Sequence, residues 1–314
     1  MKRNVVIWNW ICCLIWVLAA GCSHSEEDAD VPKDKDVKTR LLTFTQVENK
    51  GSRAVLNEDN QRLSALWNSG DELKCCNLTT LQDDIILFKE TSTGTLTAQY
   101  DTVATSIFQG TIKCGKDHQL AVIYPVTDFG FELVDGEYYA KYTITLSGQD
   151  GRLETLASNY HYMYGVASVN SVTGTMAEAT GEMQSLLAVC KFSFTDDNDN
   201  IIHVKELNIS DVYDGSGGNR QFYPRQATVK CNESGYSITP DTSNDNAGID
   251  DPLKIEFESA ANTVYVALLP VYNRTFRFNV KDASGNTYTG VAMANLSEGE
   301  FVIAPLSLNK VPAS

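Results

Sequence analysis

The sequence contains few of the residues and motifs that carry enzyme chemistry. Its four histidines, His24, His118, His161 and His203, are scattered along the chain. No GxSxG, HExxH, CxxC or phosphate-loop pattern occurs. We therefore expect no catalytic residue, no cofactor and no metal. A hydrolase, which would need a clustered acid and base, stays a rival hypothesis.

Two polar segments resemble ligand-binding loops without meeting their requirements. Residues 196–200 (DDNDN) have the spacing of the first calcium ligands of an EF-hand loop, but position 6 is Ile201 and position 12 is Leu207 instead of glycine and glutamate. The glycine-rich stretch 214–219 lacks a GK[ST] ending. We expect a hairpin turn at the first segment and a loop at the second.

Basic residues are also scarce. The chain has 25 lysines and arginines against 40 aspartates and glutamates, a formal net charge of −15. Without Lys2 and Arg3, 23 basic residues stand against the same 40 acidic ones, and the net charge is −17. Such a surface repels phosphates, so we expect no nucleic-acid partner.

The N-terminus has the order of a secretory signal. Lys2 and Arg3 supply positive charge, residues 5–20 are almost wholly apolar, and small residues occupy positions 19–21. The apolar run is shorter than the roughly 20 residues that cross a bilayer comfortably. We predict a signal peptide at residues 1–21, with an uncleaved membrane anchor or a signal peptide without lipid as alternatives.

Residues 18–22 (LAAGC) resemble the bacterial lipobox, although the leucine lies four residues before the cysteine instead of three. The resemblance implies cleavage between Gly21 and Cys22 and a lipid on the Cys22 thiol. More than one acyl chain makes such an anchor stable.

A charged linker is predicted at residues 22–39. Its first part, SHSEED at residues 23–28, resembles the export tag of Bacteroidetes lipoproteins, which implies the outer face of the outer membrane. The alternative is an acidic, solvated linker without an address. The rest alternates lysine and aspartate around Pro32 and reads as a flexible stalk.

From Leu41 onward, short runs rich in Thr, Val, Ile, Phe and Tyr alternate with glycine-containing turns, which is typical of antiparallel β-structure. A helix or loop is expected at residues 149–159. We predict an all-β protein of two successive β-sandwich domains, residues 40–170 and 171–314, divided within residues 165–181. The predicted strands are 41–47, 85–91, 95–100, 107–113, 120–124, 141–146, 186–194, 204–210, 227–230, 253–257, 264–269, 275–281, 288–294 and 301–308.

Of the eight cysteines, Cys12 and Cys13 lie in the predicted signal peptide; without it, five cysteines remain beside Cys22, an odd number. We expect buried free thiols, with one or two disulfides as an open alternative. The five are Cys75, Cys76, Cys114, Cys190 and Cys231.

Three tyrosines alternate along one segment, at Tyr160, Tyr162 and Tyr164. If their rings are exposed, they form a platform for a sugar. If they point inward, they belong to an ordinary core. A surface glycan-binding lipoprotein therefore stays a second rival hypothesis.

Short motifs follow one another in a specific order from the lipobox almost to the C-terminus: LLTFT at 41–45, SRA at 52–54, WNSGDEL at 67–73, AVIYP at 121–125, YMYG at 162–165, LLAVCKF at 186–192 and LSEGEFVI at 296–303. This order resembles the Bacteroidetes fimbrillin family of type V pilus lipoproteins. Residues 184–185 depart from the histidine-containing strand start of many relatives. The resemblance implies transthyretin-like sandwiches and partners that are other fimbrial subunits.

The resemblance also implies how such a protein is assembled. In fimbrillins a surface protease removes the first strand after an arginine, and a strand of another subunit fills the groove. In this chain the cut falls after Arg53 and makes Ala54 the new N-terminus. The removed strand is 41–47, whose Leu42 and Phe44 fill the groove. Arg40 is a second candidate that would leave the strand in place, and the alternative is a plain surface loop at residues 52–54.

The place in a pilus depends on whether the chain can donate a strand. The last predicted strand belongs to the second sandwich, and only residues 309–314, which include Pro312, follow it. We therefore expect a tip or accessory subunit. The alternative is an uncleaved surface lipoprotein that binds glycans or anchors a fimbria.

Overall fold

The computed structural model describes residues 36–47, 55–59, 62–82, 92–101, 103, 105–212, 222–243 and 250–312. Several sequence-predicted features lie outside these residues: the signal peptide 1–21, the lipidation site Cys22, residues 22–35 of the linker, the maturation site at Arg53 and Ala54, the strand at 85–91 and the glycine-rich stretch 214–219.

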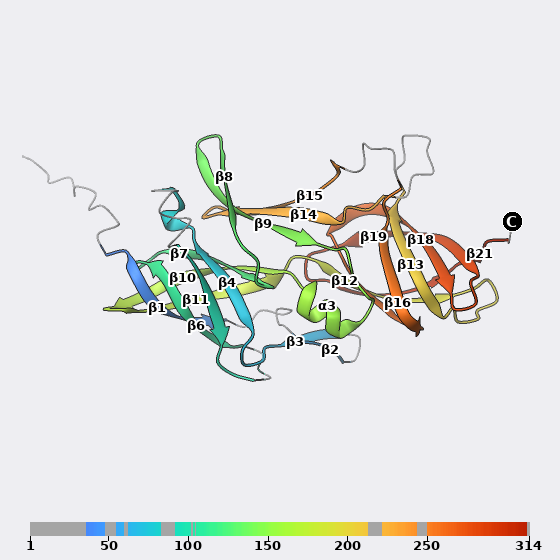
Figure 1. Cartoon of the computed structure of the whole chain (residues 1–314), viewed down its shortest axis with the longest axis horizontal. Helices are drawn as coiled ribbons and strands as arrows, with labels where there is room; N and C mark the ends of the chain where they lie inside the picture. The colour runs from blue at the N-terminus through green and yellow to red at the C-terminus, as the bar shows by residue number, and fades with distance from the viewer. Residues whose placement is uncertain are drawn as a thin grey trace, which may run out of the picture. The chain divides into compact units, whose positions relative to one another are not determined.

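The described chain is nearly all β-strand, which confirms the predicted class (Figure 1). It contains one α-helix, α3 (Leu153–Asn159), inside the segment predicted as helix or loop, and one 3-10 turn, η1 (Thr79–Gln82). The strands are β1 (Lys38–Gln46), β2 (Val55–Asp59), β3 (Arg62–Leu66), β4 (Glu72–Asn77), β5 (Thr93–Ala98), β6 (Ile107–Cys114), β7 (Gln119–Tyr124), β8 (Gly130–Val134), β9 (Glu137–Thr145), β10 (Met163–Thr173), β11 (Met176–Ser185), β12 (Ala188–Thr195), β13 (Val204–Asp211), β14 (Gln226–Asn232), β15 (Gly235–Pro240), β16 (Leu253–Ala261), β17 (Val264–Leu268), β18 (Val271–Asp282), β19 (Thr287–Leu296), β20 (Phe301–Ser307) and β21 (Asn309–Lys310).

Seven strands close into a barrel in the order β1-β11-β10-β7-β4-β5-β6. Its interior is filled by alternate side chains of these strands, as expected where successive residues point to opposite faces. Gly110 in β6 permits a close approach of β5, because a Cβ at this position would lie 2.0 Å from the carbonyl oxygen of Thr95. The barrel core includes Trp67, Leu73, Leu96, Phe108, Leu120, Val122 and Met163.

A second group of strands forms a three-stranded sheet, β17-β12-β20, and a five-stranded sheet, β16-β13-β18-β19-β21. Phenylalanines join the two sheets: the ring of Phe192 in β12 lies 5.2 Å from that of Phe278 in β18. The predicted alternation in β18 is confirmed, since Phe276, Phe278 and Val280 are all buried. Burying such aromatic side chains is the main stabilising term of a β-core.

The two halves of the chain are interleaved, which differs from the predicted pair of successive sandwiches. The residue pair 170 and 171, where the boundary was expected, lies inside β10, and β10 and β11 form a hairpin of the barrel. β9 pairs with β14 in a four-stranded sheet, β15-β14-β9-β8, so each half contributes one hairpin. Periodicity misses this because it identifies strands but not their partners.

The cysteines are as expected, and the acidic segment 196–200 forms a turn. All five cysteines of the described residues are buried free thiols, so the alternative of disulfides is not found among them. Burial raises the pKa of Cys75, Cys190 and Cys231 to about 12. Asp196 accepts the backbone N–H groups of Asn198 and Asn200, each at 2.9 Å, and so closes a tight turn beside the Thr195–Ile201 bridge. The strands on either side, β12 and β13, lie in different sheets, so the predicted turn is present but does not join a paired hairpin.

Neither a metal nor a membrane-crossing helix is indicated in the described part of the chain. No cluster of histidine, cysteine and carboxylate side chains there could hold a metal ion. No helix within the same residues has the length and apolarity needed to span a bilayer.

The β2–β3 hairpin is tied to the second group of strands by Glu58. The Glu58 carboxylate accepts two hydrogen bonds from the Lys191 ammonium group, at 2.7 and 2.8 Å, and one from the Tyr265 hydroxyl. The hydrogen bonds from Lys191 and Tyr265 lower the pKa of Glu58. Charge-assisted hydrogen bonds of this kind are stronger than neutral ones.

We predict that Glu58→Gln lowers the free energy of unfolding at pH 7 by about 1 kcal/mol. Because the pKa of Glu58 is lowered on folding, its contribution is complete above the usual carboxylate pKa and is lost as the pH falls through the folded-state value. Between pH 7 and pH 3 the wild-type protein therefore loses more stability than the variant, as urea denaturation measures. Glu72→Gln at the exposed start of β4 is the matched control. Equal losses in the wild type and Glu58→Gln would contradict the assignment.

Candidate functional site

β1 closes the barrel between two strands that are distant in sequence. It pairs antiparallel with β6 from Lys38 to Thr45 and parallel with β11 from Leu41 to Gln46. Figure 1 shows β1 in blue beside these two strands. Without β1, the facing backbone N–H and C=O groups of β6 and β11 would be unpaired, and such edges recruit another strand.

The side chains of β1 alternate strictly between the barrel interior and the surface. Arg40, Leu42, Phe44 and Gln46 are each 2% exposed or less. Leu41 between them is 41% exposed. This two-residue period arises because successive side chains of a strand point to opposite faces. β1 therefore fills a groove with four side chains.

Leu42 and Phe44 occupy the apolar middle of this groove, as the sequence predicts. The ring of Phe44 stacks on Phe108 of β6 with centroids 5.9 Å apart. Phe108 in turn meets Trp67 edge to face at 4.9 Å, and Trp67 meets Tyr124 at 5.3 Å. Burying one such side chain contributes about 1.5–3 kcal/mol, so the two together hold the strand firmly.

Polar groups mark the two ends of the groove, which the sequence analysis did not assign. Arg40 donates from Nη1 to the carbonyl oxygen of Cys114, the last residue of β6. Burial raises the pKa of the Cys114 thiol, and the nearby Arg40 partly offsets this. At the other end, the Trp67 indole N–H donates to Oε1 of Gln46 at 2.5 Å. The two-residue alternation of β1 could have predicted that Arg40 and Gln46 point inward, because it places them on the same face as Leu42 and Phe44.

Arg40 is a poor protease site in this arrangement. Its side chain is 1% exposed, and its backbone lies within β1, where it is paired with Ile112 of β6. Proteases cleave exposed, unpaired segments. Arg40 thus acts as part of the groove filling, which leaves Arg53, outside the described residues, as the maturation candidate.

The tyrosine row is part of the core. Tyr160, Tyr162 and Tyr164 are 8%, 7% and 3% exposed. The Tyr160 hydroxyl donates to the carbonyl oxygen of Ser147 at 3.0 Å, and the Tyr162 hydroxyl accepts the N–H of Thr145 at 3.1 Å. A sugar needs open aromatic faces for stacking, so these residues do not provide the platform of the glycan-binding hypothesis.

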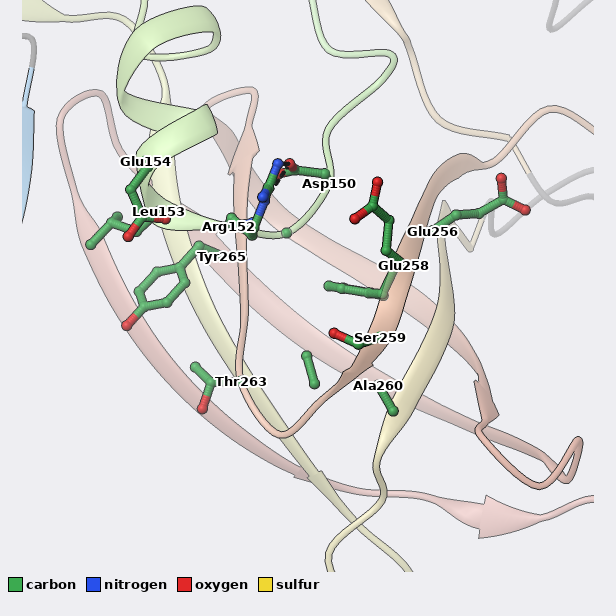
Figure 2. Close-up of a pocket in the computed structure, with 13 residues that line it drawn as sticks. Asp150, Arg152, Leu153, Glu154, Glu256, Glu258, Ser259, Ala260, Thr263 and Tyr265 are labelled. Carbon is green, nitrogen blue, oxygen red and sulfur yellow. Dashed lines mark hydrogen bonds and ion pairs between the residues drawn. The ribbon is translucent and has the colours of Figure 1, made fainter.

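A cleft of about 600 Å³ lies beside α3, between the segment Asp150–Glu154 and the strands β16 and β17 (Figure 2). Arg152 is paired with Asp150 at 2.5 Å, and Figure 2 shows Glu256 and Glu258 on the β16 side. Burial opposes ionisation of Asp150, but hydrogen bonds from Arg152 and Thr155 outweigh it and lower its pKa. The Lys254 ammonium lowers the pKa of Glu256. Neither carboxyl group is therefore suited to donate a proton at neutral pH.

The histidines do not meet in this cleft. His118 lies next to Asn77 at 2.9 Å, and His161 next to the Ser185 hydroxyl at 2.5 Å, both histidines being buried. His118 precedes β7 and His161 precedes β10, and these strands are antiparallel, so the two residues lie at opposite ends of the pair. His203 faces Asn262 at 2.5 Å. The three described histidines therefore do not supply a clustered acid and base for the hydrolase hypothesis.

Two solved structures of Bacteroides proteins have a fold similar to that of this chain. A protein described as a "putative cell adhesion protein" from Bacteroides uniformis aligns over 86% of this chain and 93% of its own, with 13% sequence identity and a TM-score of 0.51. A second one so described, from Bacteroides ovatus, aligns over 88% and 97%, with 12% identity and a TM-score of 0.50. The chain has the fold of these Bacteroides proteins.

Other comparisons add nothing to this assignment. A fimbrial protein from Bacteroides ovatus aligns over 88% of this chain and 51% of its own with a TM-score of 0.34, too low to bear on fold or function. No protein-family model matches the sequence. No curated protein matches it either. At this identity the likeness to the Bacteroides proteins establishes the fold, and the function rests on the groove.

We predict that Phe44→Ala lowers the free energy of unfolding by about 3–5 kcal/mol and Leu42→Ala by about 2–5 kcal/mol, because each opens a cavity in the barrel core. Thr45→Ala on the exposed face of the same strand is the control and changes stability by less than about 0.5 kcal/mol. Chemical denaturation of the full chain measures all three. If the three variants are equally stable, β1 does not hold the barrel together.

Proposed function

We propose that this chain is a tip or accessory subunit of a cell-surface fimbria, exported as a lipoprotein through Cys22 and assembled by strand exchange. A cut after Arg53 would release β1, and a strand of another subunit would take its place. The observation that carries the proposal is that β1 pairs on both sides and fills the barrel groove, while it precedes in sequence every other strand of the described residues.

The segments on either side of the proposed cut are held by different parts of the molecule. β1 is held by β6, β11 and the barrel core. β2 begins at Val55, directly after Ala54, and Glu58 in β2 is bonded to Lys191 and Tyr265. A cut after Arg53 would therefore leave the new N-terminus anchored, whereas β1 would remain by noncovalent contacts alone.

An emptied groove would bind a replacement strand strongly. It would expose the ring of Phe108 and the unpaired edges of β6 and β11. Main-chain hydrogen bonds and side-chain pockets are the two sources of affinity in strand addition. Both are already present in the intact chain, since β1 uses them.

A tip or accessory role is supported by the pairing of β20, which is part of this chain's own sheet. This strand pairs in parallel with β12 from Phe301 to Ser307, and the following Leu308 is buried. A strand held in this way is not free to enter a neighbouring subunit. The chain thus accepts a strand more readily than it offers one.

The lipid would have a temporary role in this scheme. If Arg53 is cut, Cys22 leaves with the segment that contains β1, and neighbouring subunits hold the protein. If Arg53 stays intact, Cys22 is a permanent anchor in the outer membrane, and the protein is an uncleaved surface lipoprotein. Host or bacterial surface proteins and glycans are further partners under this proposal. The buried tyrosines Tyr160, Tyr162 and Tyr164 do not support glycan binding.

We predict that Arg53→Ala abolishes maturation. N-terminal sequencing of the wild-type protein from assembled fimbriae should begin at Ala54, while Arg53→Ala protein should keep β1 and stay out of fimbriae. Arg40→Ala tests the buried alternative and should be cut as the wild type is. Assembly of Arg53→Ala protein at the wild-type level would refute strand exchange by this route.

We also predict that Cys22→Ala abolishes acylation and delivery to the cell surface. Metabolic labelling with an alkyne fatty acid should mark the precursor of the wild type but not of Cys22→Ala. Cys75→Ala, a buried thiol in β4, is the matched control and should keep its label. Labelling of Cys22→Ala protein would show that the lipid is elsewhere.

A further inference from the structure

β1 fits its groove through two polar contacts at its ends as well as through its apolar middle. Arg40 reaches the carbonyl oxygen of Cys114, and Gln46 accepts the N–H of Trp67 at 2.5 Å. Trp67 is fully buried. A buried N–H without an acceptor is costly, so any strand in this groove has to satisfy Trp67 as Gln46 does.

These contacts have a fixed spacing and a direction. The four inward residues of β1 occur at every second position, and with about 3.3 Å per residue Arg40 and Gln46 are about 20 Å apart along the strand. A donor, Arg40, meets a carbonyl at one end, and an acceptor, Gln46, meets an N–H at the other. A strand inserted backwards would place its basic group against the indole N–H, which is donor against donor.

The same contacts penalise shifts of register. A slip of one residue turns Leu42 and Phe44 outward. A slip of two residues keeps the inner face but places Phe44 at the Trp67 N–H and Arg40 in the apolar middle. The polar ends thus reject the shift that the alternation alone would allow.

We propose that the groove selects a replacement strand by this pattern: a basic residue at the first inward site, apolar residues at the next two, and a side-chain hydrogen-bond acceptor at the fourth. This rests on the strand exchange proposed above and specifies the partner. The occupant is an extended segment of a different chain, running in the direction of β1. A second copy of this chain is not expected to donate β20, because neither alternating set of residues from Phe301 to Leu308 begins with a basic residue.

The test uses the full chain with an engineered protease site in residues 48–54. After cleavage at this site, the piece that contains β1 stays bound to the rest of the protein by noncovalent contacts. A fluorescent peptide of residues 37–47 is added, and its exchange into the protein and its affinity are measured by anisotropy. Peptides with Gln46→Leu or Arg40→Leu should bind ten- to a hundredfold more weakly, the range expected when one buried polar group loses its partner. A peptide with Thr45→Leu, the same change of chemistry on the exposed face, should bind within threefold of the native one. A peptide of residues 301–312 should not exchange.

The outcomes separate the two proposals. If the native peptide does not exchange, strand replacement itself is wrong. If it exchanges but Gln46→Leu and Arg40→Leu peptides bind as tightly, or residues 301–312 bind as well as residues 37–47, the selection rule is wrong. Trp67→Phe in the cut protein removes the indole N–H and should bring the Gln46→Leu peptide to within threefold of the native peptide. Should Trp67→Phe fail to fold, the Arg40→Leu peptide tests the other end of the groove independently.

Discussion

The barrel depends on the pairing of one strand, β1, with two strands that are far from it in sequence. β6 and β11 do not pair with each other, and β1 supplies the hydrogen bonds that each of them lacks on that side. Leu42 and Phe44 add the apolar contacts that hold the sheet around its core. The closed barrel therefore has no free edge while β1 is present, and it acquires two when β1 leaves.

Contacts between the two halves of the chain hold the rest of the molecule together independently of β1. β9 and β14 pair across the middle of the chain, and Glu58 ties the hairpin after β1 to Lys191 and Tyr265. The large core cluster accordingly contains residues from both halves. Removal of β1 would break its pairing with β6 and β11 and expose part of the barrel core. The other core cluster, which contains no residue of β1, would stay packed.

The alternation of side chains predicted some buried residues correctly and left others unassigned. The alternation in residues 41–47 and 275–280 predicted both strands and the inward faces of Leu42, Phe44 and Phe276, all of which are buried. The same alternation already placed Arg40 and Gln46 on the inner face, yet polar residues are ordinarily assigned to the surface, so their role was missed. The strands β10 and β11 were missed because their polar residues and glycine resemble a boundary between domains.

The sequence by itself predicted part of the strands, among them β1, β6, β7, β12, β13 and β16 to β20, and the inner faces of β1 and β18, because the two-residue period is a local property of the backbone. It did not predict β2, β3, β4, β8, β10, β11, β15 or β21. It also gives the acidic charge of the chain, and it predicts a signal peptide at the N-terminus. Only the tertiary structure decided that β1 lies parallel to β11, that β9 joins β14, and that Arg40 and Gln46 meet Cys114 and Trp67. Strand pairing depends on partners distant in sequence, and many strands here share the same alternation, so no local pattern identifies the neighbour.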